Sequence, residues 1–515
     1  MRPGDIYWYN DCYGSHGAVS HSPDQVYIAP VFVDGQVSAF IQSWAHFTDI
    51  GGMRPGSLSP DALDIHQEGT IVPPVRLYAA GAFNEDAFRI FQRNSRYPDM
   101  VLGDTRASVA AVRLGERRIL EIFNRYGREQ VIGVFIALIA ETEAIFRRRL
   151  AEVFRDGSYG FADYVDSDGH GNGPFGVRLE LNSQGKRFFI DTTKSDDQAK
   201  GPINYLMHPD VPSMILGIYL LAGERDSMLN KGAARALDEV KVRQGSILQP
   251  NSPAPLGQRG VTLVRVMNAC CGLVGLATGG NSVAASNAYG LYYLRGQAGE
   301  DRGGEKFLLA DGVAVGYGAR PVADGIDAVY FVAQENYPAE FLGLGYPVRL
   351  LRYEIHCDSG GPGRWRGGAG VIREVEFLGT ECMVANRIDC NDFPPWGIKG
   401  GMNGGRGRCL INPGRPDERI LPAMSDGVIL KRGDVFRIET GGGGGWGHPF
   451  DREAERVHLD VLGGFVSPES ALRDYGVVLT GPRLDLDAEA TRRLRAERRP
   501  AAAMFHRGHY VEGFK

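Results

Sequence analysis

The first fifty residues contain short apolar runs separated by turn-forming residues, a pattern that predicts strands. Residues 27–33 and 36–42 are rich in apolar and β-branched side chains, and the dipeptide Asp34-Gly35 between them is a strong hairpin signal. Further strands are predicted at residues 5–9, before an Asn-Asp turn. We therefore expect the chain to begin with a β-rich region built around this hairpin.

The second strand of the hairpin leads into a pair of polar residues. Residues 38–41 are an apolar run typical of a buried strand, and His46 and Asp49 follow it just before Gly51-Gly52. Functional side chains are common where a strand gives way to a loop. Aromatic residues also gather here, and they can be core residues or a pocket wall: Tyr7, Trp8, Tyr9, Trp44 and Phe47.

A helical section follows the β-rich start. Residues 104–126 and 129–154 show amphipathic periodicity, with Gly127 as a stop between them, and residues 86–93 predict a shorter helix. The remaining predicted elements are strands at 158–166, 176–181, 187–192, 348–357, 370–378, 382–388 and 434–440, and helices at 212–222, 467–475 and 487–498.

This order of elements predicts an α+β, multidomain protein rather than a doubly wound sheet. We expect four regions, which are a β-rich region with the candidate site (1–100), a helical hairpin (101–157), a mixed α/β region (158–312) and a β-rich region with Gly-rich loops (313–515). A chain of 515 residues exceeds the size of one ordinary core, which agrees with several structural units.

Composition narrows the class of function. The net charge of −5 has both signs mixed along the chain, which argues against a nucleic-acid surface. The seven cysteines include no Cys-x-x-Cys pair, so neither a zinc ribbon nor a disulfide framework is indicated. We expect no signal peptide, no membrane-spanning stretch and a cytoplasmic location.

The candidate chemistry lies in the first seventy residues. Imidazoles and carboxylates recur there, and together they could bind a divalent metal such as Zn or Mn or transfer protons. The alternative is structural, with His46 capping a loop and Asp49 accepting hydrogen bonds from the backbone of the turn. The candidates are Asp11, His21 with Asp24, His46 with Asp49, and His66.

Two glycine-rich stretches lie in the C-terminal half. Residues 441–445 are five consecutive glycines, but no Gly-x4-Gly-Lys-Ser/Thr motif occurs in the chain, so a nucleotide-binding loop is not predicted. Close backbone packing or a mobile lid is the expected role. In the second stretch, Arg364 and Arg366 could hold a carboxylate or a phosphate, although a structural turn is the more common role.

Taken together, the motifs resemble the B subunits of the hydantoinase/oxoprolinase family. This family also includes large subunits of acetone and acetophenone carboxylases and the C-terminal half of 5-oxoprolinases. The matching motifs occur in family order over almost the whole chain. They are Pro3-Gly4-Asp5, Asn10-Asp11, His21-x-Pro-Asp24, residues 30–35, His46-x-x-Asp49, Gln67-Glu68-Gly69 with Pro73-Pro74, residues 103–107, 346–368, 393–397 and 441–449.

The resemblance implies a division of labour between subunits. ATP is bound to an actin-like A subunit, which phosphorylates a carbonyl or enolate oxygen, whereas the B subunit holds a divalent metal. Carried over by position, His46 and Asp49 match the metal pair of the family, and Asp11 and His21 are motif residues near it. Where some members have another histidine ligand, this sequence has Thr70-Ile71, and His66 could substitute.

Some members also carry an N-terminal segment that supplies a further ligating Asp, whereas this sequence starts directly at the Pro-Gly-Asp motif. The metal site is therefore expected to be incomplete, completed by a partner chain, or lost. The implied function is hydrolysis of a cyclic amide (hydantoin, oxoproline or lactam) in a hetero-oligomer with a hydantoinase A-like subunit. The alternatives are a subunit of an ATP-dependent ketone carboxylase and a metal-free scaffold subunit.

Overall fold

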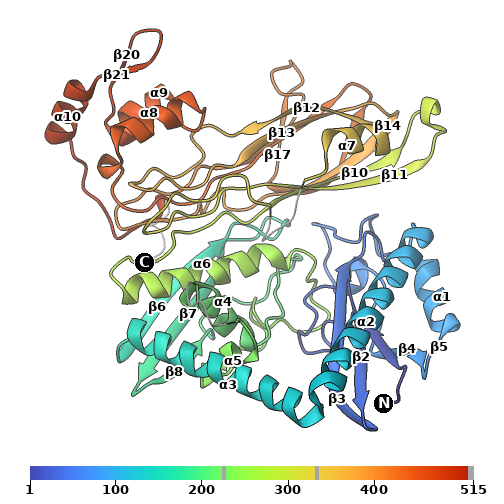
Figure 1. The fold of residues 1–515 in the computed structure, drawn as a ribbon. Coiled ribbons are helices and arrows are strands. Elements are labelled where there is room, and N and C mark those ends of the chain that lie inside the picture. Colours follow the sequence, from blue (N-terminus) through green and yellow to red (C-terminus); the bar gives the residue numbers. More distant parts are fainter. Residues whose placement is uncertain (223–227, 331–335, 509–515) are drawn as a thin grey trace. The chain divides into compact units, whose positions relative to one another are not determined.

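The computed structural model describes residues 1–222, 228–330 and 336–508. The chain divides into two compact units, one formed by Met1–Ser158 with Leu181–Thr262 and the other by Tyr159–Glu180 with Leu263–Lys515. Helices and strands are mixed along the chain without regular βαβ alternation (Figure 1), so the α+β prediction is confirmed. The four sequence regions remain a prediction.

The N-terminal unit begins with a five-stranded sheet in the order β3-β2-β1-β4-β5. Helices α1 (Glu85–Asn94) and α2 (Pro98–Tyr126) supply side chains to the core on one face, where Trp8 packs edge-on against Phe91 with ring centroids 4.9 Å apart. The strands are β1 (Ile6–Tyr9), β2 (Asp24–Val33), β3 (Gln36–His46), β4 (Val75–Ala79) and β5 (Ala82–Phe83).

β3 differs from its sequence-based prediction. It is an edge strand with alternating exposure, and Phe40 in its middle is 54% exposed, so the run at 38–41 is not a buried strand. Its inward residues pack on α2, where Ile41 lies against Gly115. The apolar run therefore reflects one face packed on a helix and one face left open.

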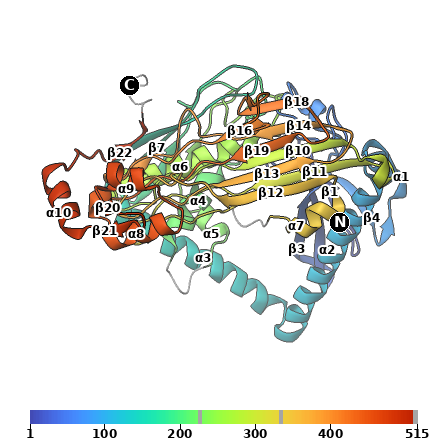
Figure 2. The ribbon, with the colours of Figure 1, turned by 90° about the horizontal axis from the view of Figure 1, so that it is seen from above.

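The two long predicted helices are present. α2 ends at Gly127, which has a positive φ of 81°, and α3 (Arg128–Val153) begins immediately after it. Figure 2 shows the two helices diverging from this corner rather than lying side by side. The N-terminal unit is completed by α4 (Asp210–Leu220), α5 (Lys231–Ala234) and the parallel pair β8 (Arg187–Asp191) and β9 (Glu239–Lys241). Strands β6 (Gly157–Val165) and β7 (Phe175–Gln184) lie largely in the segment Tyr159–Glu180 of the other unit.

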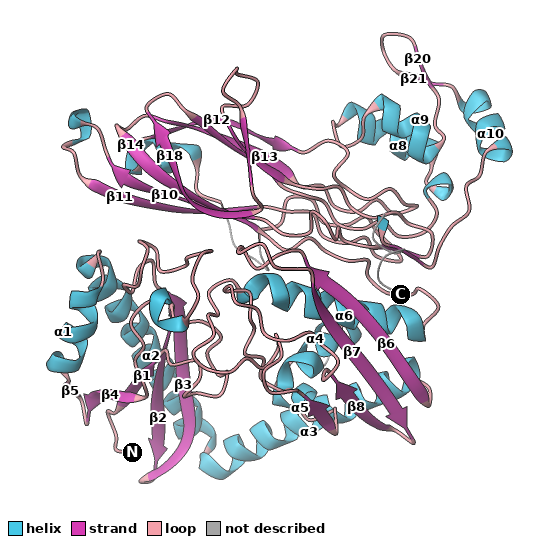
Figure 3. Ribbon diagram, turned by 180° about the vertical axis from the view of Figure 1, so that it is seen from behind, coloured by secondary structure: helices cyan, strands magenta, loops and turns pink. Residues whose placement is uncertain are grey.

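The C-terminal unit contains two antiparallel sheets that share one core (Figure 3). Inward side chains from both sheets meet there, among them Leu294, Val384 and Phe436. One sheet has the order β11-β10-β14-β18 and the other β12-β13-β19-β16-β17. Their strands are β10 (Gly290–Gln297), β11 (Lys306–Val313), β12 (Val348–Ile355), β13 (Val371–Phe377), β14 (Glu381–Arg387), β16 (Arg408–Ile411), β17 (Arg419–Leu421), β18 (Met424–Lys431) and β19 (Val435–Glu439).

The pentaglycine segment is packed into this unit. The Gly443 N–H donates to the Gly368 carbonyl at 2.9 Å, and the Gly361 N–H donates to the Gly443 carbonyl at 2.9 Å. A Cβ at Gly443 would lie 2.2 Å from the carbonyl carbon of Tyr317. The glycines therefore permit backbone segments to approach each other without side chains between them, which agrees with the close-packing role and not with a lid.

Several helices of the described residues were not predicted, and the longest of them is apolar. α6 (Arg259–Ala277) covers the Cys270-Cys271 segment and is long and apolar enough to cross a membrane, which corrects the expectation that no stretch approaches that length. However, 78% of its apolar window is buried, as expected for a core helix. In the C-terminal part of the chain, α8 (Ala454–Leu462) and α9 (Pro468–Tyr475) contribute to a small apolar cluster. Helix α10 (Ala488–Glu497) follows them.

Candidate active site

A cluster of ionisable side chains lies at the end of the β2–β3 hairpin. β2 begins at Asp24 and β3 ends at His46, and these residues are directly opposite each other in the antiparallel pair. In the turn before β2, Nε2 of His21 lies 3.0 Å from Oδ1 of Asp24. The ring centroids of His21 and His46 are 5.0 Å apart. The hairpin thus brings two predicted site residues, His21 and His46, together around Asp24.

A cation from a distant segment completes the cluster. Nη2 of Arg259, the first residue of α6, lies 3.2 Å from Oδ2 of Asp24, and its Nε donates to Oγ of Ser20 at 2.7 Å. Burial raises the pKa of Asp24, but His21 and Arg259 outweigh this effect and hold that pKa below its ordinary value. Asp24 is therefore a carboxylate at neutral pH.

His21 is a neutral imidazole in this environment. Burial, and then the positive charge of Arg259, lower the pKa of His21 to about 3 although Asp24 opposes the shift. Because Nε2 lies 3.0 Å from a carboxylate oxygen, we assign the proton of the neutral ring to Nε2, which leaves Nδ1 as an acceptor. The residue is only 2% exposed, so His21 can act on a substrate only through a neighbouring residue.

That neighbour is His46, whose side chain is exposed. Phe40 and Trp44 stand on the same exposed face of β3, since side chains two residues apart along a strand point the same way. Trp44 is 62% exposed, whereas Trp8 is a core residue with 1% exposure. The site therefore presents one accessible imidazole beside an aromatic surface, with a buried imidazole and a carboxylate behind it.

Asp49 lies in the loop after β3 with its side chain fully buried. Its Oδ1 accepts hydrogen bonds from the backbone N–H groups of Gly51 (3.2 Å) and Arg96 (2.9 Å). Its Oδ2 accepts from the Gly56 N–H at 2.9 Å and from the Arg96 guanidinium at 3.0 Å. Both oxygens are thus occupied by donors that hold the turn, as in the structural alternative considered for this residue.

Two other predicted site residues lie in local turns or helices of their own. Oδ1 of Asp11 accepts from the Gly14 N–H at 2.8 Å in its own turn. His66 is exposed on the short helix η1 (Ile65–Glu68), which Asp64 caps. Among the five predicted residues, the rings of His21 and His46 lie close together, with centroids 5.0 Å apart.

The residues do not form a ready metal site in this arrangement. Among the described residues, no three His, Cys, Asp or Glu side chains converge as metal ligands. A metal at Asp49 would have to displace N–H donors from both carboxylate oxygens. The assignment of His46, Asp49 and His66 as metal ligands therefore remains a prediction.

Two buried residues of the family motifs support the site and were not proposed for it. The Asn10 side chain accepts from the Val72 N–H at 2.5 Å and donates to the Ser22 carbonyl at 2.8 Å, which ties the turn before β2 to the segment after η1. Glu68 accepts from the Gly257 N–H at 2.6 Å, and burial raises the pKa of Glu68 to about 8. Their complete burial in otherwise polar motifs is visible only in three dimensions.

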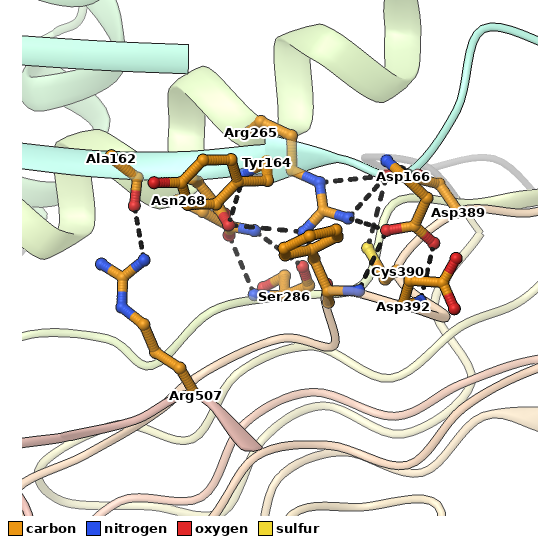
Figure 4. Close-up of polar contacts among 12 residues, drawn as sticks. Ala162, Tyr164, Asp166, Arg265, Asn268, Ser286, Asp389, Cys390, Asp392 and Arg507 are labelled. Carbon is orange, nitrogen blue, oxygen red and sulfur yellow. Dashed lines mark hydrogen bonds and ion pairs between the residues drawn. The ribbon is translucent and has the colours of Figure 1, made fainter. Parts of the chain in front are cut away.

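A second charged network is buried in the C-terminal unit (Figure 4). Arg265 of α6 lies with Nη2 2.8 Å from Asp389 and 3.3 Å from Asp166, and with Nη1 3.5 Å from Asp163. Nη1 also donates to the Phe393 carbonyl at 3.0 Å. Arg265, Asp163 and Asp389 have fully buried side chains.

This network contains three carboxyl groups around one guanidinium. Burial, and then the charge of Asp389, raise the pKa of Asp166 to about 7, and burial also raises the pKa of Asp163. The Asp166 carboxylate accepts from the backbone N–H groups of three consecutive residues, 391–393, so the network holds this loop in place. The sequence analysis missed this network, which could have been indicated by the single Arg265 within an apolar stretch, because a buried guanidinium requires carboxylate partners.

Comparison with known proteins places the chain in a family. A family model described as Hydantoinase B/oxoprolinase matches residues 1–449. The B subunit of the putative D-/L-hydantoinase of Pseudomonas sp. (strain NS671) is 31% identical over 512 residues, covering 96% of this chain and 84% of its own length. The acetophenone carboxylase delta subunit of Aromatoleum aromaticum (strain DSM 19018 / LMG 30748 / EbN1) is 26% identical, covering 96% and 78%.

A solved structure agrees with these relatives. The crystal structure of the ATP-dependent caprolactamase from Pseudomonas jessenii superposes with a TM-score of 0.82 and 26% identity, covering 96% of this chain and 86% of that chain. The chain belongs to the hydantoinase B/oxoprolinase family.

Proposed function

We propose that this chain is the B subunit of an ATP-dependent complex that hydrolyses a cyclic amide such as a hydantoin, oxoproline or lactam. The observation that carries the proposal is similarity over 96% of the chain both to a hydantoinase component and to an ATP-dependent caprolactamase. Hydantoins and caprolactam share a ring amide. The absence of a P-loop motif from the sequence supports binding of ATP by a partner of the hydantoinase A type.

The exposed imidazole of His46 is the group best placed to act on substrate. Once the partner has phosphorylated the carbonyl oxygen, attack by water requires a base to accept its proton, and a neutral imidazole does this near pH 7. Behind His46, the buried His21 is oriented by Asp24 at 3.0 Å, and its ring lies 5.0 Å from that of His46. His46 is therefore the proposed general base, with His21 and Asp24 as positioning residues.

An ATP-dependent ketone carboxylase remains the second candidate, because the acetophenone carboxylase delta subunit covers 96% of this chain. In that reaction the same imidazole would remove a proton next to the ketone carbonyl rather than a proton from water. A scaffold subunit without chemistry of its own is the third candidate. In each case we propose a cytoplasmic hetero-oligomer.

Coexpression of the chain with a hydantoinase A-type subunit tests these candidates. ADP release by the purified complex is measured with hydantoin, 5-oxoproline or caprolactam, and separately with acetone or acetophenone plus bicarbonate. Cyclic amides should stimulate ADP release and yield the ring-opened acid. Stimulation only by a ketone with bicarbonate would favour carboxylation, and turnover that survives loss of the His46 imidazole would favour the scaffold.

A further inference from the structure

A surface pocket of the C-terminal unit contains several positive charges. Its volume is about 410 Å³, and its walls come from the turn before β13, the segment after β15 (Gly397–Ile398), the end of the pentaglycine segment and the chain after α10. The side chains that matter are Arg364, Lys399, Trp446, His448, Asp451 and Arg499. All of them lie in one compact unit.

Lys399 is held at this pocket by a strained backbone. Its φ is +54°, a conformation that residues other than glycine rarely adopt and that often marks a functional position. The Lys399 N–H donates to the Met504 carbonyl at 2.7 Å, and Nζ lies 5.1 Å from the centroid of the Trp446 ring. This cation–π contact fixes the ammonium group at the pocket while the side chain stays exposed.

Arg364 lies on the other side of the Trp446–Gly447 segment. Its N–H donates to the Gly447 carbonyl at 3.0 Å, and its Cβ lies close enough that a Cβ at Gly447 would be 3.0 Å from it. Arg366, the other arginine of this turn, is buried and pairs with Asp327 at 2.8 Å, so its role is structural. Arg364 is exposed, and among the described residues neither it nor Lys399 forms an ion pair with a carboxylate.

The remaining charges of the pocket are already compensated. Arg499 pairs with both oxygens of Asp451, at 2.8 and 2.9 Å. His448 accepts from the Phe450 N–H through Nδ1, and its Nε2 donates to the Pro500 carbonyl at 3.1 Å. With three cations and one carboxylate, the pocket has a net charge of about +2 at neutral pH.

We propose that this pocket binds a phosphate group, with Arg364 and Lys399 as its ligands. A phosphate monoester carries about −1.5 to −2 charges at pH 7, which matches the uncompensated charge better than a single carboxylate does. A guanidinium offers two parallel donors to phosphate oxygens, and an ammonium adds a third from a separate direction. The site is independent of the proposed function, because none of these residues belongs to the N-terminal unit that holds His46.

Binding of inorganic phosphate to the full-length chain tests the proposal. Equilibrium dialysis with labelled phosphate, at constant ionic strength set with chloride, should show saturable binding of one phosphate per chain. Lys399→Asn removes the charge but tolerates a positive φ, and Arg364→Gln removes the guanidinium but keeps a polar side chain. Each variant should weaken binding about tenfold or more, the usual effect of losing one charge-assisted hydrogen bond.

Arg456→Gln is the matched control. Arg456 also lies over a tryptophan, 5.2 Å from the Trp365 ring centroid, but it pairs with Glu453 at 3.0 Å and does not line the pocket. This variant should bind phosphate as the parent chain does. Equal weakening by the control, no saturable binding by the parent chain, or competition by acetate as effective as by glycerol 2-phosphate would overturn the proposal.

Discussion

Asp24 and His46 face each other across the β2–β3 pair because of a β-bulge. Next to the turn, Val33 pairs with Gln36 and Phe32 with Val37, but beyond an irregularity at this point Val31 pairs with Ala39. Without that shift of one residue, Asp24 would lie opposite Ala45. Since alternate side chains point to opposite faces of a strand, the bulge decides that His46 rather than its neighbour joins His21 and Asp24.

The first prediction concerns His46. His46→Ala should lower turnover of the complex about 100-fold or more, the usual contribution of a general base, while the midpoint of thermal unfolding changes little because the side chain is exposed. Steady-state ADP release and product formation measure the effect. Gln42→Ala is the matched control, since Gln42 is exposed on the same face of β3. Similar losses in both variants would contradict a specific role for the imidazole.

The second prediction concerns the pH dependence of stability caused by His21. The folded-state pKa of about 3 lies below the ordinary value of 6.5, so between these values the unfolded chain binds a proton that the folded chain does not. Stability is therefore lost as the pH falls below 6.5, by about 1.4 kcal/mol per pH unit near the middle of this range.

His21→Gln removes this titration, and its free energy of unfolding should depend less on pH between 6.5 and 4 than that of the parent chain. Urea unfolding at several pH values measures the difference. His16→Gln is the control, because that histidine is exposed. Parallel pH profiles for the parent chain and His21→Gln would contradict the buried, neutral state of His21.

Secondary structure elements were predicted correctly where one face of a segment is buried and the other faces solvent. The α2–α3 boundary was predicted from amphipathic periodicity and from Gly127, and the structure has both helices. Helix α6 was not predicted, because it is apolar on almost every side and its sequence therefore shows no hydrophobic stripe with a 3.6-residue period. Its Arg265 interrupts the apolar pattern in the sequence although that side chain is fully buried.

Only those contacts of the candidate site that join residues close in sequence could be predicted. The His21–Asp24 pair spans three residues and belongs to a recognisable motif, and the structure places the two side chains 3.0 Å apart. The contact of His21 with His46 depends on the bulge, and that of Asp24 with Arg259 joins segments far apart in the chain. Neither the bulge nor this long-range pairing leaves a signal in the residue pattern.

The third prediction separates the two roles of Asp49. Asp49→Asn replaces one acceptor oxygen by an NH2 group that would face N–H donors, so it should destabilise the chain by about 1.5–3 kcal/mol. Denaturant unfolding measures this cost, and elemental analysis of the purified complex is done in parallel. An unchanged stability together with loss of a bound divalent metal would contradict the structural role and support the metal prediction.

The fourth prediction concerns Glu68, whose folded-state pKa of about 8 is above its ordinary value of 4.5. Between these values the folded chain holds a proton that the unfolded chain has released, so stability falls as the pH rises towards 8. Glu68→Gln keeps an oxygen that accepts from the Leu256 and Gly257 N–H groups and cannot ionise. The variant should therefore be more stable than the parent chain at pH 8.5 and similar to it at pH 5, as measured by denaturant unfolding.

The last prediction concerns the buried network of the C-terminal unit. Arg265→Met would leave Asp163, Asp166 and Asp389 buried without their shared cation, so it should destabilise the chain by about 3–5 kcal/mol at pH 7.5. The cost should shrink at pH 5.5, because protonation of Asp166, whose pKa is about 7 even with Arg265 present, neutralises part of the excess charge.

Arg349→Met serves as its control, since Arg349 pairs with Glu376 in the same unit but is 61% exposed, and surface pairs contribute less than about 1 kcal/mol. Urea unfolding of both variants at the two pH values distinguishes a charge effect from a packing effect. Loss of a well-packed side chain alone would destabilise the chain equally at pH 7.5 and 5.5, and that outcome would contradict the electrostatic role of Arg265. A cost confined to the higher pH would show that Arg265 is retained in the apolar helix to balance the three carboxylates.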